Sequence, residues 1–141
     1  MSTRMRTYQE MKELVAFLPR LYSEGFKPVI KWNGGDRGED GFIILPWPEY
    51  NPVVEEFYRL VASAWLDDGY RPEEAARMLK DEEFVKSASL SQIKTMLTYC
   101  VRGERFSDGH WAEMIENGYI RKILERVNEL STDVQQRTDS T

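Results

Sequence analysis

The sequence predicts a mostly α fold of the α+β class, a compact helical domain of four to five main helices with one short β-hairpin. Apolar residues recur at three- and four-residue steps along most of the chain, which is the helical period. Two short β-rich runs flank one glycine-rich loop. No internal repeat or long linker divides the 141 residues, so one core is expected.

The first helix is expected to begin at Thr7, because Thr7 and Glu10 have the spacing of a capping box. An apolar stripe of helical period follows over residues 11–22. Pro19 lies inside this stripe and has no amide hydrogen, so a kink or a break is expected near it. Gly25 is a natural end of the segment.

The β signal comes next. Residues 29–32 and 42–45 are short runs rich in β-branched and aromatic side chains, and the loop between them, residues 33–41, is rich in glycine. They predict a hairpin over about 28–45 with a mobile tip, and the turn at 46–48 is expected to end its second strand. Two strands alone are marginal in water, so the hairpin must pack against helices.

The next part of the chain is expected to be helical. Asn51 followed by Pro52 is typical of a helix N-terminus, because the asparagine caps the helix and the proline needs no donor there. This helix is expected to end at residues 68–69. A short helix over 72–79 follows, with one or two further turns over 81–86.

The last third also reads as helical. Ser89 and Gln92 form a second capping box, and Gly103 ends the helix that they begin. A short helix is expected over 108–116, with Asp108 as its N-cap. The Asn-Gly pair that follows favours a left-handed helix end.

A final helix is expected over residues 120–130. From residue 131 the tail is polar, with no apolar residue beyond Val134. We therefore expect the domain to span residues 7–130, with flexible termini at 1–6 and 131–141.

The net charge of −5 is unevenly spread. Residues 38–85 hold 12 Asp and Glu against 4 Lys and Arg, and such an acidic segment repels the phosphates of a nucleic acid. No apolar run approaches the roughly 20 residues of a membrane helix, and residues 1–6 lack a signal-peptide core. With one cysteine, Cys100, we expect a cytoplasmic protein that does not enter a membrane.

Residues capable of chemistry are densest between two of the predicted helices. His110 could act as a general base or metal ligand beside nearby carboxylates, and an arginine could bind an anion. The candidate residues are Arg102, Glu104, Arg105, Asp108, His110 and Glu113.

A structural interpretation of these residues is favoured over a catalytic one. Asp108 is expected to cap a helix, and Glu104 and Arg105 to form an ion pair that holds the turn. A zinc site needs three or four ligands, and the chain has one cysteine and one histidine, so neither a metal nor a cofactor is expected. Cys100 lies on an apolar stripe and is expected to be inert.

Aromatic residues suggest a different kind of site. Four tryptophans are many for this length, and Trp47 and Tyr50 lie in a turn beside acidic residues. Aromatic side chains rimmed by acid can bind a basic peptide or another subunit, so these two are candidate binding residues and a homo-oligomer or protein partner is expected.

The last two helices resemble a helix-turn-helix in outline. Arg121, Lys122 and Arg126 supply cations, but Glu125 and Glu129 interleave with them, which is typical of a solvated surface. Binding of nucleic acid is therefore a minor alternative.

One segment resembles a known family. Arg102-Gly103-Glu104-Arg105-Phe106, followed by Gly109-His110-Trp111, is similar to a group of small bacterial and archaeal proteins classified only as a domain of unknown function. The similarity extends to the turn at 46–50 and spans most of residues 10–130. It implies a compact, mostly helical domain in a prokaryotic cytoplasm, and it brings no activity, cofactor or catalytic residue.

Function is therefore open at this point. We expect a small cytoplasmic binding or interaction module without catalytic activity. One alternative is a small enzyme or an anion- or ligand-binding protein with a site at residues 102–113. The other is a nucleic-acid-associated protein that uses its last two helices.

Overall fold

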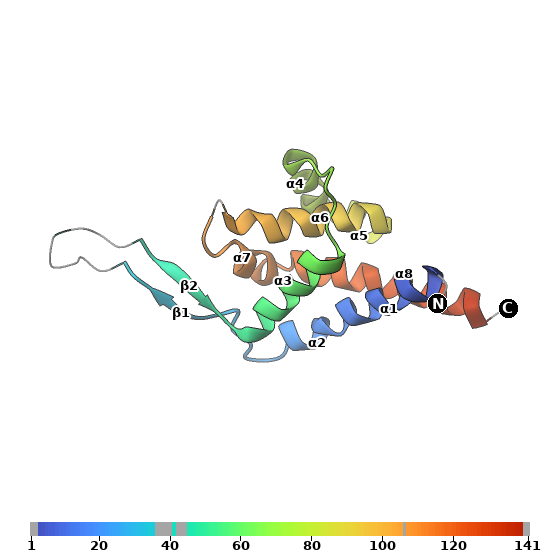
Figure 1. The fold of residues 1–141 in the computed structure, drawn as a ribbon, viewed down its shortest axis with the longest axis horizontal. Coiled ribbons are helices and arrows are strands. Elements are labelled where there is room, and N and C mark those ends of the chain that lie inside the picture. Colours follow the sequence, from blue (N-terminus) through green and yellow to red (C-terminus); the bar gives the residue numbers. More distant parts are fainter. Residues whose placement is uncertain (1–2, 36–40, 42–44, 106, 140–141) are drawn as a thin grey trace.

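The computed structural model describes residues 3–35, 41, 45–105 and 107–139 (Figure 1). Within them it confirms a mostly helical fold with one antiparallel β-hairpin. The helices are α1 (Thr3–Val15), α2 (Phe17–Leu21), α3 (Pro52–Ala64), α4 (Pro72–Lys80), α5 (Glu82–Lys86), α6 (Leu90–Arg102), the 3-10 turn η1 (Gly103–Arg105), α7 (His110–Glu116) and α8 (Tyr119–Asp139), and the strands are β1 (Val29–Asn33) and β2 (Trp47–Tyr50).

The hairpin projects from one end of the helical body, and both ends of the chain lie at the opposite end (Figure 1). The helices share one hydrophobic core, in which side chains from distant parts of the sequence are fully buried. Among the largest of these are Leu14, Phe57, Trp65, Ile93 and Ile123. No helix in the described ranges is long and apolar enough to span a membrane.

Helices α1 and α8 run side by side in opposite directions, so the two ends of the chain stabilise each other (Figure 1). The hydroxyl of Tyr8 donates to Oε1 of Gln135 across this contact. The helices extend past the predicted domain bounds of residues 7 and 130, because α1 begins at Thr3 and α8 continues to Asp139. Ser131 is buried and Val134 packs against the core, which explains why the last helix extends past residue 130.

Helix α1 ends at Val15, and α2 begins after Ala16. The predicted break at Pro19 is confirmed, because Pro19 has no N–H to donate to the carbonyl of Val15 four residues before it. The predicted N-cap at Thr7 is wrong, since Thr7 lies in the second turn of α1. A capping-box spacing therefore occurred inside a helix, where packing against α8 extends the first turn.

Other helix boundaries follow local capping chemistry. Oδ1 of Asn51 accepts from the N–H of Val53 at 3.0 Å, as predicted. The capping box of Ser89 and Gln92 is also confirmed, with both reciprocal bonds present. Asp81 caps α5 through Phe84, in the segment predicted to be one or two helical turns.

The second strand differs from the prediction. Of the run expected to form it, residues 42–44 lie outside the described residues, and Leu45 is exposed and belongs to no strand. The strand β2 is instead Trp47–Tyr50, which was expected to be the turn that ends the hairpin. It pairs with β1 through Trp32 opposite Pro48 and Asn33 opposite Trp47. A proline is tolerated because both strands of a two-stranded ribbon are edge strands.

Candidate functional site

The connection between α6 and α7 is organised by the carboxylate of Glu104. It accepts from the hydroxyl of Tyr50 at 2.7 and 2.8 Å, from the N–H of Gly109 at 3.1 Å and from the N–H of Trp111 at 2.9 Å. Glu104 therefore caps α7 and fixes the base of the hairpin to it. Burial and the Glu104 carboxylate raise the pKa of Tyr50, so its hydroxyl stays a donor.

The helix cap differs from the predicted one. Gly109, with φ of 91°, is the N-cap of α7, and the exposed Asp108 makes no cap bond. The expected ion pair of Glu104 with Arg105 is also absent from the described contacts, because backbone N–H groups and a tyrosine hold the Glu104 carboxylate. Glu104, five residues before the N-cap Gly109, thus caps the helix in place of Asp108.

His110 is enclosed and is not placed as a catalytic base. Its side chain is 7% exposed, and Nε2 is buried without a hydrogen-bond partner. The ring meets Tyr99 edge to face, with centroids 5.4 Å apart. Burial lowers the pKa of His110, and the carboxylates of Glu113 and Glu104 oppose this shift only in part. His110 is therefore neutral at pH 7 and belongs to the packing of α7 on α6.

Gly103 makes room for this imidazole. A Cβ atom placed on Gly103 would lie 2.2 Å from Nε2 of His110, far inside van der Waals contact. The φ of Gly103 is −60°, an ordinary helical value, so the glycine is required by the close approach and not by the backbone conformation. Sequence reasoning missed this pairing, because its only signal was a glycine and a histidine seven residues apart.

The one cysteine of the chain is also buried. Cys100 is fully buried, and burial raises the pKa of its thiol, so the sulfur is held in the unreactive protonated form, as expected from its position on an apolar stripe. No group of three or more His, Cys, Asp or Glu side chains in the described residues is placed to hold a metal ion.

The candidate residues divide between separate places. Arg102, Glu104 and Arg105 line one open pocket of about 400 Å³, together with Ala62, Leu66, Val101 and Trp111. We refer to it as the arginine pocket. Glu113 does not reach it and lines two other hollows. The structure thus separates the arginines from the histidine and from the acid that were grouped in the sequence.

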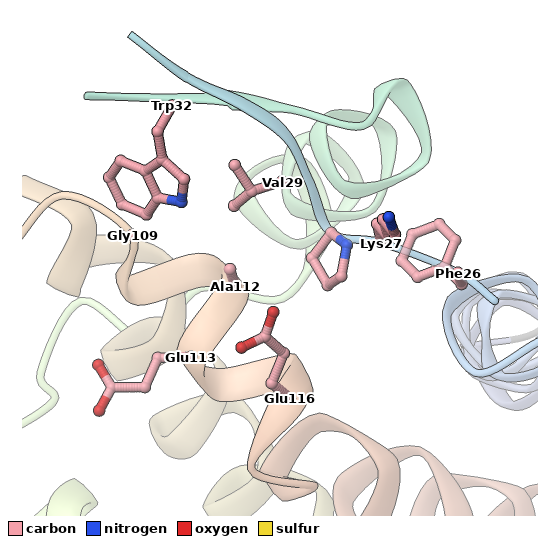
Figure 2. A pocket seen from close by; sticks show the side chains of 9 residues that line it. Phe26, Lys27, Val29, Trp32, Gly109, Ala112, Glu113 and Glu116 are labelled. Carbon is pink, nitrogen blue, oxygen red and sulfur yellow. The ribbon is translucent and has the colours of Figure 1, made fainter. Parts of the chain in front are cut away.

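A second pocket of about 400 Å³ lies between β1 and α7 (Figure 2). The indole of Trp32 covers Gly109, where an added Cβ would lie 2.9 Å from Cη2 of the ring. Figure 2 shows the carboxylate of Glu116 directed into the hollow, whereas Glu113 points away from it. Trp32 therefore anchors the hairpin on α7 while half of its side chain stays exposed.

The hairpin carries the exposed apolar surface of the described chain. Four large apolar side chains are exposed, and all lie between residues 30 and 47: Ile30 at 57%, Trp32 at 52%, Leu45 at 77% and Trp47 at 51%. Of the two predicted binding residues, Trp47 is exposed. Tyr50 is 8% exposed and holds Glu104, so it cannot belong to an aromatic surface.

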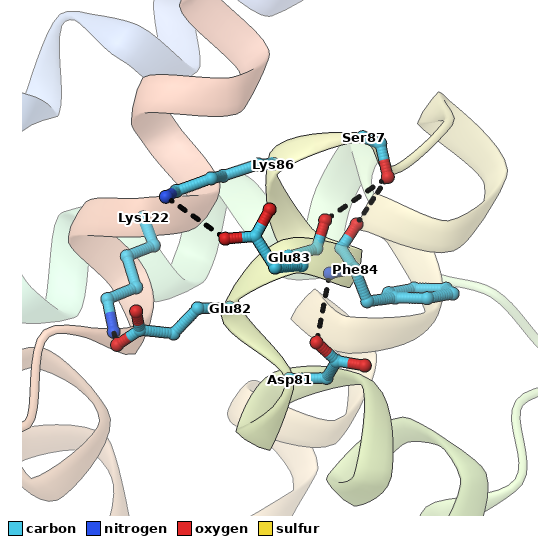
Figure 3. Close-up of polar contacts among 7 residues, drawn as sticks. All are labelled: Asp81, Glu82, Glu83, Phe84, Lys86, Ser87 and Lys122. Atoms are coloured by element: carbon cyan, nitrogen blue, oxygen red, sulfur yellow. Dashed lines mark hydrogen bonds and ion pairs between the residues drawn. The ribbon is translucent and has the colours of Figure 1, made fainter.

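The three cations that were candidates for nucleic-acid binding, all in the described part of α8, already have acidic partners. Arg121 pairs with Glu125 along α8, and Arg126 pairs with Glu129. Figure 3 shows Lys122 meeting Glu82 of α5, where the contact ties α5 to α8. Binding to a nucleic acid needs cationic side chains that are free to neutralise phosphates and so displace the counterions of the nucleic acid, and this arrangement therefore gives little support to a nucleic-acid interface.

Comparison with known proteins gives one result. Neither the curated proteins nor the solved structures contain a significant match to this chain. The model of a family of unknown function, DUF6508, matches residues 6–133. The match includes the Arg-Gly-Glu-Arg block at 102–105 and the helices that surround it, and it confirms the resemblance to a domain of unknown function. The chain belongs to this family, DUF6508.

Proposed function

We propose that the chain is a non-catalytic interaction module of the cytoplasm that forms a homodimer through its β-hairpin. The observation that carries this proposal is the position of the large apolar side chains that are exposed among the described residues, since all of them lie between residues 30 and 47, in the projecting hairpin and its loop. Half of a tryptophan side chain is about 100 Å², and burying that area contributes about 2.5 kcal/mol. A ribbon of two strands is marginal in water, so covering it with protein stabilises it.

The pairing of the strands defines one outward face. Lys31 lies opposite Glu49, and Asn33 lies opposite Trp47. Because side chains alternate along a strand, these four residues share a face, and Tyr50 lies on the other face with its side chain buried. We call Lys31, Asn33, Trp47 and Glu49 the outward face.

The edges of the ribbon are less suited to binding than this face. Pro48 lies within β2 and Pro46 directly precedes it, and a proline removes a donor from the edge. Lys31 on β1 also discourages the addition of another strand. A contact through the outward face needs no additional strand at either edge, so neither the prolines of the β2 edge nor Lys31 at the β1 edge hinders it.

The charges on the outward face suit a second copy of the chain. In a two-fold contact each surface meets itself, so a face with one lysine and one glutamate can set Lys31 of one protomer against Glu49 of the other. Trp47 of each protomer lies beside these pairs and supplies the apolar contact. The two symmetric Lys31–Glu49 pairs between the protomers fix the register of the dimer.

The absence of catalysis is supported by the positions of the candidate groups. His110 is buried and neutral, Cys100 is protonated and buried, and the arginines lie in a different place from Glu113. General acid–base or nucleophilic chemistry needs these groups within hydrogen-bond reach of one another and of a substrate.

Sedimentation velocity of the full chain over a concentration series tests the dimer. We expect the wild type to shift from monomer to dimer as concentration rises. Trp47→Ser is expected to weaken the dimer at least tenfold, and Trp47→Phe to retain most of it. A wild type that stays monomeric at the highest concentration, or a Trp47→Ser variant that dimerises equally well, contradicts the proposal.

A further inference from the structure

We infer that the arginine pocket binds the carboxylate of a small molecule that carries an apolar body. The pocket has the volume of a small-molecule site, about 400 Å³, and is formed by α3, the end of α6, η1 and α7. This inference does not depend on the hairpin dimer, because none of the residues on the outward face lines the pocket.

The cationic side of the pocket is only lightly compensated. Arg102 lies over the ring of Tyr70 at 5.1 Å, which holds its guanidinium in place. It pairs with Asp68 at 3.8 Å, and the Asp68 side chain is 99% exposed, so water screens the pair. The carboxylate of Asp67 also lies close enough for Arg102 to lower its pKa, although Asp67 accepts its hydrogen bonds from Thr95 and Gly69. The side chain of Arg105, which is exposed, makes no ion pair or hydrogen bond with any described residue.

Glu104 also lines this pocket, but its carboxylate already accepts hydrogen bonds from other groups. Its two oxygens accept from Tyr50, Gly109 and Trp111 and pair with neither arginine. Among the residues that line the pocket, two arginines and one glutamate leave a single positive charge, and the exposed Asp68 pairs with Arg102 from outside this lining. That balance matches a monoanion, and a guanidinium binds a carboxylate through two parallel hydrogen bonds.

Part of the pocket's lining is apolar and rigid. The indole of Trp111 stacks on Tyr58 with centroids 4.6 Å apart and planes inclined by 12°. Its Nε1 donates to the carbonyl of Val101 at 2.9 Å, which fixes the ring. Leu66 and Ala62 complete the apolar part of the lining. A fixed aromatic wall beside a cation favours a ligand with a flat or branched apolar group, whereas inorganic phosphate offers nothing to cover it.

Binding is tested by NMR titration of the ¹⁵N-labelled full chain with phenylacetate, followed at the Trp111 indole N–H and the Nε–H of both arginines. Phenylacetamide has the same ring without the charge, and inorganic phosphate has charge without a ring. We expect saturable shifts with phenylacetate and binding at least tenfold weaker for the other two probes. Equal binding of phenylacetamide or of phosphate, or no saturable shift with phenylacetate, overturns the inference.

Three variants locate the binding. Arg105→Gln is expected to weaken phenylacetate binding at least tenfold, whereas Arg77→Gln, which removes an exposed arginine of α4, leaves it unchanged. Ala62→Phe keeps the charges but fills the pocket from an exposed helix position, and it is also expected to abolish binding. Phenylacetate binding retained by both Arg105→Gln and Ala62→Phe places the probe elsewhere and refutes the assignment.

Discussion

The substitution Gly103→Ala isolates the close approach of η1 to His110. A Cβ at this position would lie 2.2, 2.4 and 2.6 Å from three atoms of the imidazole. The ring is enclosed and packed against Tyr99, so it cannot move aside without displacing α7. Overpacking of this kind costs about 2–3 kcal/mol.

Conformational entropy by itself predicts that Gly103→Ala stabilises the folded protein. Gly103 has helical φ and ψ, so an alanine there would on its own stabilise the protein by about 0.5–1 kcal/mol. The two effects together predict a net loss of about 2 kcal/mol in the free energy of unfolding, measured by urea denaturation at pH 7.5. Gly69→Ala is the matched control, because its nearest neighbour is 3.6 Å from the added atom. It is expected to be neutral or slightly stabilising.

A double-mutant cycle with His110→Ala completes the test. His110→Ala empties the space that the new Cβ needs, so the steric cost of Gly103→Ala disappears in the double variant. We expect a favourable coupling of about 2–3 kcal/mol between the two substitutions. A Gly103→Ala protein as stable as the wild type, or a coupling near zero, would refute the account of this contact.

Three further predictions concern stability. Glu104→Ala leaves three donors without their acceptor and is expected to cost about 2–4 kcal/mol in urea denaturation, more than Tyr50→Phe, and an equal loss for the two contradicts the capping role. The pKa of His110 is lowered from 6.5 by burial, so its contribution to stability is present above pH 6.5 and is lost as pH falls through the folded pKa. Urea midpoints at pH 7.5 and 5 are therefore expected to differ less in His110→Gln than in the wild type, and an unchanged difference argues against an enclosed neutral imidazole. Ser89→Ala is expected to cost about 1 kcal/mol by loss of the N-cap, whereas the exposed Ser91→Ala changes the thermal midpoint little, and similar effects at both sites contradict the cap.

Most helices could be predicted from the sequence because their signals are local. The caps at Asn51 and Ser89 use side chains within three residues of the N–H groups that they satisfy. The break caused by Pro19 depends only on a missing donor four residues from an acceptor. Such signals need no knowledge of the rest of the fold.

The errors have non-local causes. The strand β2 forms where Tyr50 can reach Glu104, 54 residues away, although prolines in the segment suggested a turn. The cap of α7 likewise comes from Glu104, and no local pattern favours it over Asp108. The extension of α8 to Asp139 depends on α1 lying beside it. Each case was decided by a tertiary contact.

The arrangement of the candidate residues could not be predicted for the same reason. Residues 102–113 were singled out because reactive side chains are dense there, but proximity in the sequence does not show in which direction each side chain points. The turn at η1 sends the side chains of Arg102 and Arg105 to one pocket and encloses His110 against Gly103. The exposed tryptophan of the predicted binding pair, Trp47, could be identified from its acidic and proline-rich surroundings, whereas the burial of Tyr50 could not.

The central claim is the hairpin homodimer, and mixing two charge-reversed variants tests it most directly. Lys31→Glu and Glu49→Lys each set like charges against one another in a symmetric contact, so each variant alone is expected to sediment as a monomer. An equimolar mixture restores both opposite-charge pairs and is expected to sediment as a dimer at the same total concentration. Lys12→Glu, on the exposed face of α1, is the control and should dimerise as the wild type does. A mixture that stays monomeric, or single variants that dimerise unaided, contradicts the account.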